Sequence, residues 1–127
     1  MTTQPLALSR IGQLALTVTD LDRAVTFYGD LLRLRHLFSF PGMAFFDCGG
    51  VRLMLTRPEG DNRVVSGGFT VYFHVEDIDA ACATLRERGV RFEDDPHLIA
   101  KMPDHELWMA FFRDPDGHLL ALMCERR

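Results

Sequence analysis

The sequence predicts an α+β fold in which one β-α-β-β-β unit occurs twice within a single domain. Two observations lead to this fold class: two helical patterns that each follow an apolar strand and an aspartate, and constant spacings between equivalent residues of the two halves. A chain of 127 residues has the usual size of one domain. We therefore expect one domain at residues 1–127, with modules at about 9–57 and 68–125.

The duplication is visible in the spacing between equivalent residues of the two halves. Residues of the first strand and the helix recur after 57 positions, whereas residues of the last hairpin recur after 67. Two constant spacings indicate a duplicated unit whose second copy carries about ten more residues before its last hairpin. The pairs that give these spacings are Gln13 and Thr70, Asp20 and Asp77, Gly50 and Gly117, and Met54 and Ala121.

The first module begins with an apolar, β-prone segment at residues 11–18. Asp20 follows as a helix N-cap, because its carboxylate can accept hydrogen bonds from backbone N–H groups of the first turn. Apolar residues at helical spacing then continue to Leu32 and predict one buried stripe. The remaining elements are strands at residues 36–40, 43–48 and 51–56, the last two joined by a tight turn at Gly49 and Gly50.

The second module repeats this order of elements. We expect a strand at residues 69–75, a helix that begins after Asp77 and ends near Gly89, and a hairpin of strands at 106–113 and 118–124. The segment at residues 94–105 is long for a connection and carries His97 and His105. It is interpreted either as a functional lid or as an ordinary solvated loop.

Composition and charge exclude several classes of function. The net charge is −4, the pI is near 5.7 and the basic residues are scattered, which argues against a nucleic-acid partner. No apolar stretch is long enough to span a bilayer, so we expect no membrane partner. The three cysteines are widely spaced and indicate no disulfide framework. We therefore expect a cytoplasmic protein.

A resemblance to a known family rests on three phrases that recur in order and cover nearly the whole chain. They are VTDLDRAVTFYGDLLRL at 18–34, FHVEDIDAACATLRERGV at 73–90 and FFRDPDGHLLALM at 111–123. With them the sequence resembles the vicinal oxygen chelate superfamily of glyoxalases, bleomycin-resistance proteins and extradiol dioxygenases. The resemblance implies two tandem βαβββ modules whose curved mixed sheet surrounds an open cup, commonly in a homodimer. Arg33 stands where the family usually has glycine, so we expect this turn to differ.

The resemblance also implies where a divalent metal would bind, on the first and last strands of both modules. The corresponding residues of this chain are Gln13, Met54, Thr70 and Ala121. Only Gln13 is of a type that the family uses, and a catalytic metal site usually needs three protein ligands. We therefore expect no metal and no other cofactor.

Strand parity predicts the residues that face the cup, because residues two apart on a strand share a face of the sheet. The residues that alternate with the cup-facing ones along each strand are almost all apolar, and we expect them to pack under the helices. The cup side is mixed, as in ligand sites with apolar walls and a few polar groups. The residues proposed to bind a ligand are Gln13, Arg52, Met54, Tyr72, His74 and Trp108.

Each of these candidates also has a structural interpretation. Gln13 either orients a ligand or bonds a neighbouring strand, and Arg52 either binds a carboxylate or phosphate or is a solvated charge at a strand end. Tyr72 is expected to be a wall residue because its ordinary pKa is near 10. His74 is expected at the rim, with proton transfer as the less favoured role. Trp108 is either core or a ligand contact at the mouth of the cup.

Three functions are compatible with these features. The favoured one is a metal-independent cup, resembling bleomycin-resistance proteins, that binds a small, partly apolar organic molecule with an optional anionic group. The first alternative is a divalent-metal-dependent lyase, isomerase or epimerase of the glyoxalase type. The second is a dimeric interaction module with a vestigial cup. No nucleophile–base pair is evident, so the sequence gives no reaction type.

Overall fold

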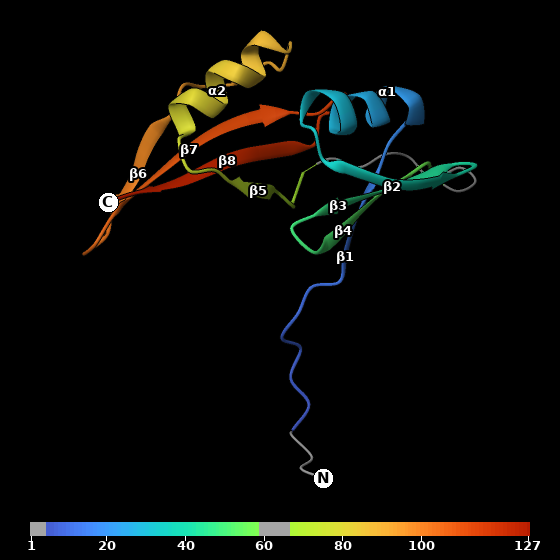
Figure 1. The fold of residues 1–127 in the computed structure, drawn as a ribbon, viewed down its shortest axis with the longest axis horizontal. Coiled ribbons are helices and arrows are strands. Elements are labelled where there is room, and N and C mark those ends of the chain that lie inside the picture. Colours follow the sequence, from blue (N-terminus) through green and yellow to red (C-terminus); the bar gives the residue numbers. More distant parts are fainter. Residues whose placement is uncertain (1–4, 59–66) are drawn as a thin grey trace.

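The computed structural model describes residues 5–58 and 67–127 and contains two modules of the same topology (Figure 1). Each module has a four-stranded mixed sheet and a helical segment, and both helices lie on the same side of the sheets, above them in Figure 1. The elements are β1 (Gln13–Thr17), α1 (Leu21–Val25), η1 (Thr26–Leu31), β2 (Arg35–Phe40), β3 (Met43–Cys48), β4 (Val51–Thr56), β5 (Val71–His74), α2 (Ile78–Glu87), β6 (His97–Lys101), β7 (Glu106–Arg113) and β8 (Leu119–Arg126). The predicted α+β fold class of two βαβββ modules is confirmed.

Strand order and register are the same in the two sheets. The first sheet has the order β1-β4-β3-β2 and the second has β5-β8-β7-β6, and the first two strands of each order are parallel. Ala15 is the partner of Met54 in the first sheet, and Tyr72 is the partner of Ala121 in the second. These two pairs are related by the spacings of 57 and 67 that the sequence predicted, so the duplication holds at the level of single residues.

Both helical segments begin as the sequence predicts. The carboxylate of Asp20 accepts from the backbone N–H of Arg23, and that of Asp77 accepts from Ala80, each at 3.1 Å. The helices then differ: α2 is a regular helix of ten residues, whereas α1 has five and continues as a π-helix of six, η1.

The core lies between the sheets and the helices, and it draws residues from both modules. Leu16, Leu55, Leu120 and Leu122, all of the parity predicted to face the helices, are buried. Burying a leucine side chain stabilises the fold by about 1.5–3 kcal/mol, so this apolar parity fixes which face of each strand points inward. The alternation in the sequence therefore sets the orientation of every strand that carries a candidate site residue.

The turn between β7 and β8 ties the second module to the first. The Tyr28 hydroxyl donates to the buried carboxylate of Asp114 at 2.8 Å, and the Thr19 hydroxyl donates to Asp116 at 2.7 Å. The His118 ring lies 2.7 Å, through Nε2, from the carbonyl oxygen of Thr17. We call this set, Thr17, Thr19, Tyr28, Asp114, Asp116 and His118, the inter-module contact. It joins segments about a hundred residues apart in sequence.

Two expectations from the sequence are corrected by the structure. The segment at 94–105 is neither a lid nor a plain loop, because it contains β6, which pairs antiparallel with β7. The turn at Arg33 keeps the left-handed backbone that glycine favours, with φ of 60°, so the expectation that it would differ is wrong. Within residues 5–58 and 67–127, no helix is long and apolar enough to cross a membrane.

Candidate ligand-binding site

Five of the six predicted ligand-binding residues lie on strands, and their side chains are on the face of the sheet opposite to the face that packs against the core. We call this side of each sheet its outer face, the side away from the helices. On the first sheet, Gln13 of β1 and Arg52 of β4 are register partners, and Met54 follows two residues along β4. The Gln13 amide donates a weak hydrogen bond to the Met54 sulfur at 3.9 Å. These three side chains therefore form one continuous group on the outer face.

Arg52 is an exposed cation that contacts aromatic rings. Its guanidinium carbon lies 5.8 Å from the ring centroids of both Phe38 and Phe45. Within the described parts of the chain, its guanidinium makes no ion pair with a carboxylate, although Asp47 is its register partner on β3. The rings attract the cation but leave its N–H donors free for an anion.

Phe38 and Phe45 belong to a cluster of three phenylalanines, which Phe40 completes. The Phe38 ring lies 4.7 Å from that of Phe45 and 5.5 Å from that of Phe40. Phe38 and Phe40 are exposed, at 40% and 57% of their surface, which is unusual for large apolar side chains grouped together. Sequence reasoning missed them because it assigned faces only on the first and last strands of each module, and a β-bulge between His36 and Phe38 interrupts the alternation of β2.

The second outer face is aromatic and carries no comparable cation at its centre. The ring of Tyr72 meets that of Phe111 edge-on at 6.2 Å, and the His97 ring lies 6.2 Å from Phe111 on the other side. His74 is exposed near the end of β5, which agrees with its predicted place at the rim. His97 was assigned to a loop by the sequence, and strand β6 brings it to this row of rings.

The structure does not bring Trp108 to the other candidates. Its register partner is the buried Cys124, and it packs against the core on the helix side of the sheet. Its indole N–H donates to Glu106 at 3.2 Å, and the guanidinium of Arg126 lies 4.3 Å from its ring centroid. The residue two positions along β7, Ala110, is buried with the same parity, and this signal in the sequence could have excluded Trp108.

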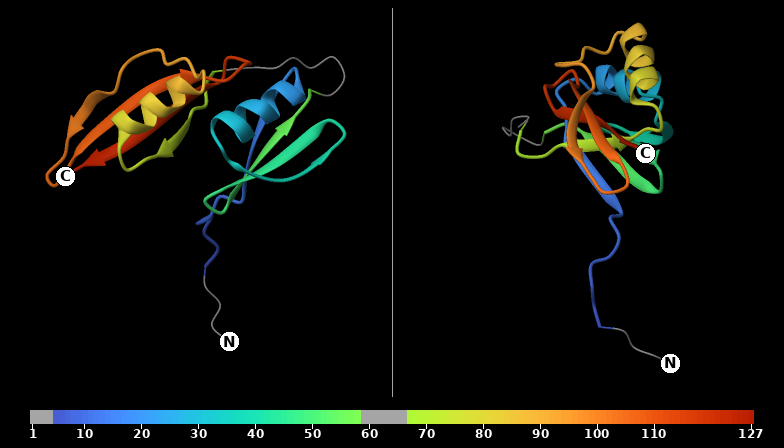
Figure 2. Two further views of the ribbon diagram at one scale, coloured as in Figure 1. Left: turned by 45° about the horizontal axis from the view of Figure 1, so that its top comes forward. Right: turned by 90° about the vertical axis from the view of Figure 1, so that its left-hand side faces the viewer.

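Within one chain, the two outer faces lie on the same side of the molecule, away from the two helices (Figure 1). A small cavity between the modules is lined by Leu14 and Leu16 of β1 together with Val71 and Phe73 of β5. These residues belong to the helix sides of the two sheets, and both helices lie on that side (Figure 2). The candidate residues therefore form two separate groups, one on each sheet.

The residues present do not fit a catalytic divalent metal. The positions that the family resemblance implies offer an amide, a thioether, a hydroxyl and a methyl group, at Gln13, Met54, Thr70 and Ala121. Across the described residues, no three His, Cys, Asp or Glu side chains gather where they could hold a metal ion. Divalent metals in enzymes are bound mainly by imidazole, carboxylate and thiolate groups, and none of these four positions offers one.

The cysteines do not supply an activated nucleophile either. Burial raises the pKa of the Cys48 thiol, and the neighbouring Asp47 carboxylate raises it further. Burial also raises the pKa of Cys82, which lies in the core. A thiol with a raised pKa is protonated at neutral pH and reacts slowly, so both cysteines are structural.

Comparisons with known proteins agree with the fold. The family described as Glyoxalase/Bleomycin resistance protein/Dioxygenase superfamily matches residues 10–122. An uncharacterized protein of Bacillus subtilis, YraH, is 32% identical and covers 89% of this chain and 96% of its own length. The metallothiol transferase FosB of Shouchella clausii is 30% identical over 88% of this chain and 77% of its own. The structure of lactoylglutathione lyase from Agrobacterium tumefaciens has a TM-score of 0.74 at 25% identity, covering 92% of this chain and 94% of that one.

Proposed function

Because the chain belongs to the glyoxalase, bleomycin-resistance and dioxygenase superfamily, we propose that it binds a small organic anion with an apolar body on its outer faces, without a resident metal. The observation that carries this proposal is Arg52, an exposed arginine flanked by Phe38 and Phe45 and without a carboxylate partner in the described chain. A guanidinium beside phenyl rings offers donors to a carboxylate and an apolar surface to the rest of the ligand.

This geometry gives the expected contributions of Arg52 and of the phenylalanines to the affinity for a ligand. A hydrogen bond to a charged group is worth about 1.5–3 kcal/mol, which corresponds to roughly a ten- to hundredfold change in affinity. Contacts of a ligand ring with Phe38 and Phe40 add about 0.5–1.5 kcal/mol for each favourable pair of rings. The charge of Arg52 therefore dominates the proposed preference for an anion, and the phenylalanines select its apolar body.

The experiment is a thermal-shift screen of small aromatic carboxylic acids and their neutral amides, followed by calorimetric titration of the best acid. We expect Arg52→Met, which keeps much of the aliphatic stem, to weaken binding ten- to hundredfold. Arg91→Met removes another exposed arginine and serves as the control, with unchanged affinity expected. Equal affinity of the wild type and Arg52→Met would assign Arg52 to the solvated surface. If no acid binds at all, the exposed phenylalanines favour a protein-interaction module instead.

A homodimer would complete this site, and we include it in the proposal. The candidate residues of one chain lie on two separate sheets, and among the described strands β1 and β5 each have one unpaired edge that a second chain could cover. Apolar side chains that a partner could bury are exposed along the N-terminal segment and the sheets: Leu6, Leu8, Ile11, Phe38, Phe40 and Tyr72. A partner chain would place a first outer face opposite a second one.

We also propose that the protein is cytoplasmic and has neither a nucleic-acid nor a membrane partner. The negative net charge disfavours nucleic acid as a partner, and a small organic ligand needs no membrane. The three described cysteines are free, which suits the reducing cytoplasm.

Metal-dependent transferase or lyase chemistry is the second candidate function, and the names of the FosB relative and of the lyase favour it. Our proposal predicts far less than one divalent metal per purified chain and no thermal stabilisation by added Mn²⁺ or Zn²⁺. A metal bound only to the native state would stabilise it by about 2.7 kcal/mol at a hundredfold excess over its dissociation constant. Elemental analysis that finds near one metal per chain, lost in Gln13→Ala, would establish the second candidate instead.

A further inference from the structure

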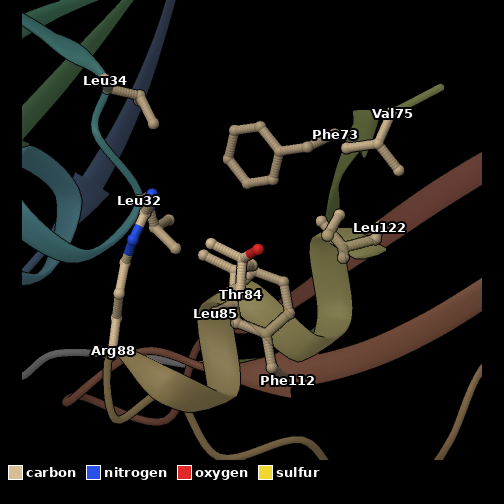
Figure 3. Close-up of a pocket in the computed structure, with 10 residues that line it drawn as sticks. Leu32, Leu34, Phe73, Val75, Thr84, Leu85, Arg88, Phe112 and Leu122 are labelled. Carbon is tan, nitrogen blue, oxygen red and sulfur yellow. The ribbon is translucent and has the colours of Figure 1, made fainter. Parts of the chain in front are cut away.

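A second cavity lies on the opposite side of the fold from the outer faces. It has a volume of about 270 Å³ and lies between the two modules, beside α2 (Figure 3). The first module contributes Leu32 and Leu34, and the second contributes β5, α2 and the buried strands below them. None of the five outer-face candidates contributes to its wall.

The wall of this cavity is apolar apart from two side chains of α2 and its C-cap, Thr84 and Arg88. Phe73 and Leu85 extend toward its centre from β5 and α2 (Figure 3). A wall of this composition excludes water from most of the space and favours an apolar occupant.

Arg88 brings a positive charge to the wall. One of its guanidinium nitrogens donates to the carbonyl oxygen of Leu31 in the first module at 3.0 Å, which holds the side chain along the wall beside Leu32 (Figure 3). In the described ranges of the chain, it has no ion pair with a carboxylate. The guanidinium has five N–H donors, so most remain free for a bound anion.

The volume limits the size of the occupant. An engineered apolar cavity of about 150 Å³ binds benzene, so a cavity nearly twice as large accepts a bicyclic aromatic or a short branched chain. A free carboxylate on such a body would complement the charge of Arg88.

We propose that this cavity is a second ligand site, which binds a compact apolar acid with its carboxylate on Arg88 and its body against Phe73 and Leu85. Both modules hold the ligand, because Leu32 and Leu34 close the side opposite to α2. The site is independent of Arg52 and of the outer faces. Its ligand bridges the same two modules that the inter-module contact joins, so occupancy stabilises their relative placement.

The test uses 2-naphthoate as the probe and Arg52→Met protein as the background, because this substitution weakens the outer-face site. We expect 2-naphthoate to bind this protein with one site per chain. Adding Ala81→Leu, which fills part of the cavity from α2, should weaken binding at least tenfold while the folded state persists. Adding Arg88→Met should weaken it ten- to hundredfold.

A matched probe tests the charge without any change in the protein. The neutral 2-naphthamide has nearly the same shape as 2-naphthoate, and we expect it to bind the Arg52→Met protein ten- to hundredfold more weakly. The proposal is overturned if Arg52→Met alone abolishes binding of 2-naphthoate. It is also overturned if Ala81→Leu leaves the affinity unchanged, or if a second chain fills the cavity so that neither probe binds.

Discussion

The outer faces of the two sheets differ although their strands have the same order and register. On the first, the cation of Arg52 lies beside the exposed ring of Phe38 and the buried ring of Phe45. On the second, Tyr72, Phe111 and His97 form a row of rings. The two modules share a backbone plan but differ in side chains, with an exposed cation beside phenyl rings on one sheet and a row of aromatic rings on the other.

The turns that join the last two strands of each module also differ between the modules. The first module joins its last two strands through Gly49 and Gly50, which have positive φ and no side chain to contact a neighbour. The second uses residues 114–117, whose carboxylates reach across to Tyr28 and Thr19. The first module thus carries the proposed charge of the site, and the second carries the groups that hold the modules together.

The largest effect is expected on ligand affinity, if one binding site combines the first outer face of one chain with the second outer face of its partner. If the site is shared by two copies, mixing Arg52→Met with Tyr72→Ala protein restores native sites, because each heterodimer combines one native first face with one native second face. We expect about a quarter of all sites in an equilibrated equal mixture to recover wild-type affinity, a ten- to hundredfold gain over Arg52→Met alone.

The controls are each variant alone, and light scattering of the wild type at micromolar concentration. Only monomer mass would contradict the homodimer. Dimer mass without any recovery in the mixture would place each complete site within one chain.

The next effect concerns the contact between Tyr28 and Asp114. Tyr28→Phe leaves a carboxylate oxygen of Asp114 without its hydroxyl donor in a buried position, and this should lower the free energy of unfolding by about 1–3 kcal/mol. Urea denaturation at pH 7 measures the loss. Tyr72→Phe is the matched control on the exposed outer face, with a change within about 0.5 kcal/mol. Equal effects of the two substitutions would contradict the role of this contact.

The same contact gives a dependence on pH whose sign is defined. Burial, and then the nearby Asp114, raise the pKa of Tyr28 above its ordinary value. The stabilisation from a raised pKa is fully present below the tyrosine pKa of the unfolded chain, near 10, and is lost as the pH rises above it. The wild type should therefore exceed Tyr28→Phe in its free energy of unfolding by a constant amount through neutral pH. This excess should become smaller above about pH 10.

The register of the strands could be predicted from the sequence because it depends on local alternation and on the repeat. Leu16 and Leu120 point inward because a shift of one residue would expose every apolar side chain of the strand. Strand β6 was missed because its sequence, HLIAK, is short and lies at a sheet edge beside prolines and acidic residues. This strand forms by pairing with β7, and such a non-local contact cannot be recognised from the spacing of apolar residues in the sequence.

The candidate site was predicted in part for the same reason. Parity predicted that Gln13, Arg52, Met54, Tyr72 and His74 lie on the side of the sheets away from the core, and all five do because they lie on regular strands, while their binding of a ligand stays a prediction. Phe38 and Phe45 beside Arg52 were not identified, because parity was read only on the first and last strands of each module and these residues lie on β2 and β3, with a bulge in β2 that breaks its alternation. How the two modules sit together was also beyond the sequence, because it depends on contacts such as that between Tyr28 and Asp114.

The smallest expected effect comes from comparing the turns that follow the two helices. Both chain segments reach the left-handed region there, at Gly89 in the second module (φ 95°) and at Arg33 in the first (φ 60°). A residue with a side chain costs about 1–2 kcal/mol in this conformation, whereas glycine adopts it freely but gains entropy in the unfolded state. Arg33→Gly should therefore stabilise the protein by about 0.5–1 kcal/mol, as measured by urea denaturation.

The matched substitution in the second module should have the opposite sign. A Cβ atom added at Gly89 meets no neighbouring atom within 4 Å, so Gly89→Ala reports the backbone cost alone. We expect it to lower the free energy of unfolding by about 1–2 kcal/mol. If Arg33→Gly destabilises the protein while Gly89→Ala behaves as expected, then Arg33 makes a contact that offsets its strain. In that case the two turns differ in interactions as well as in residue type.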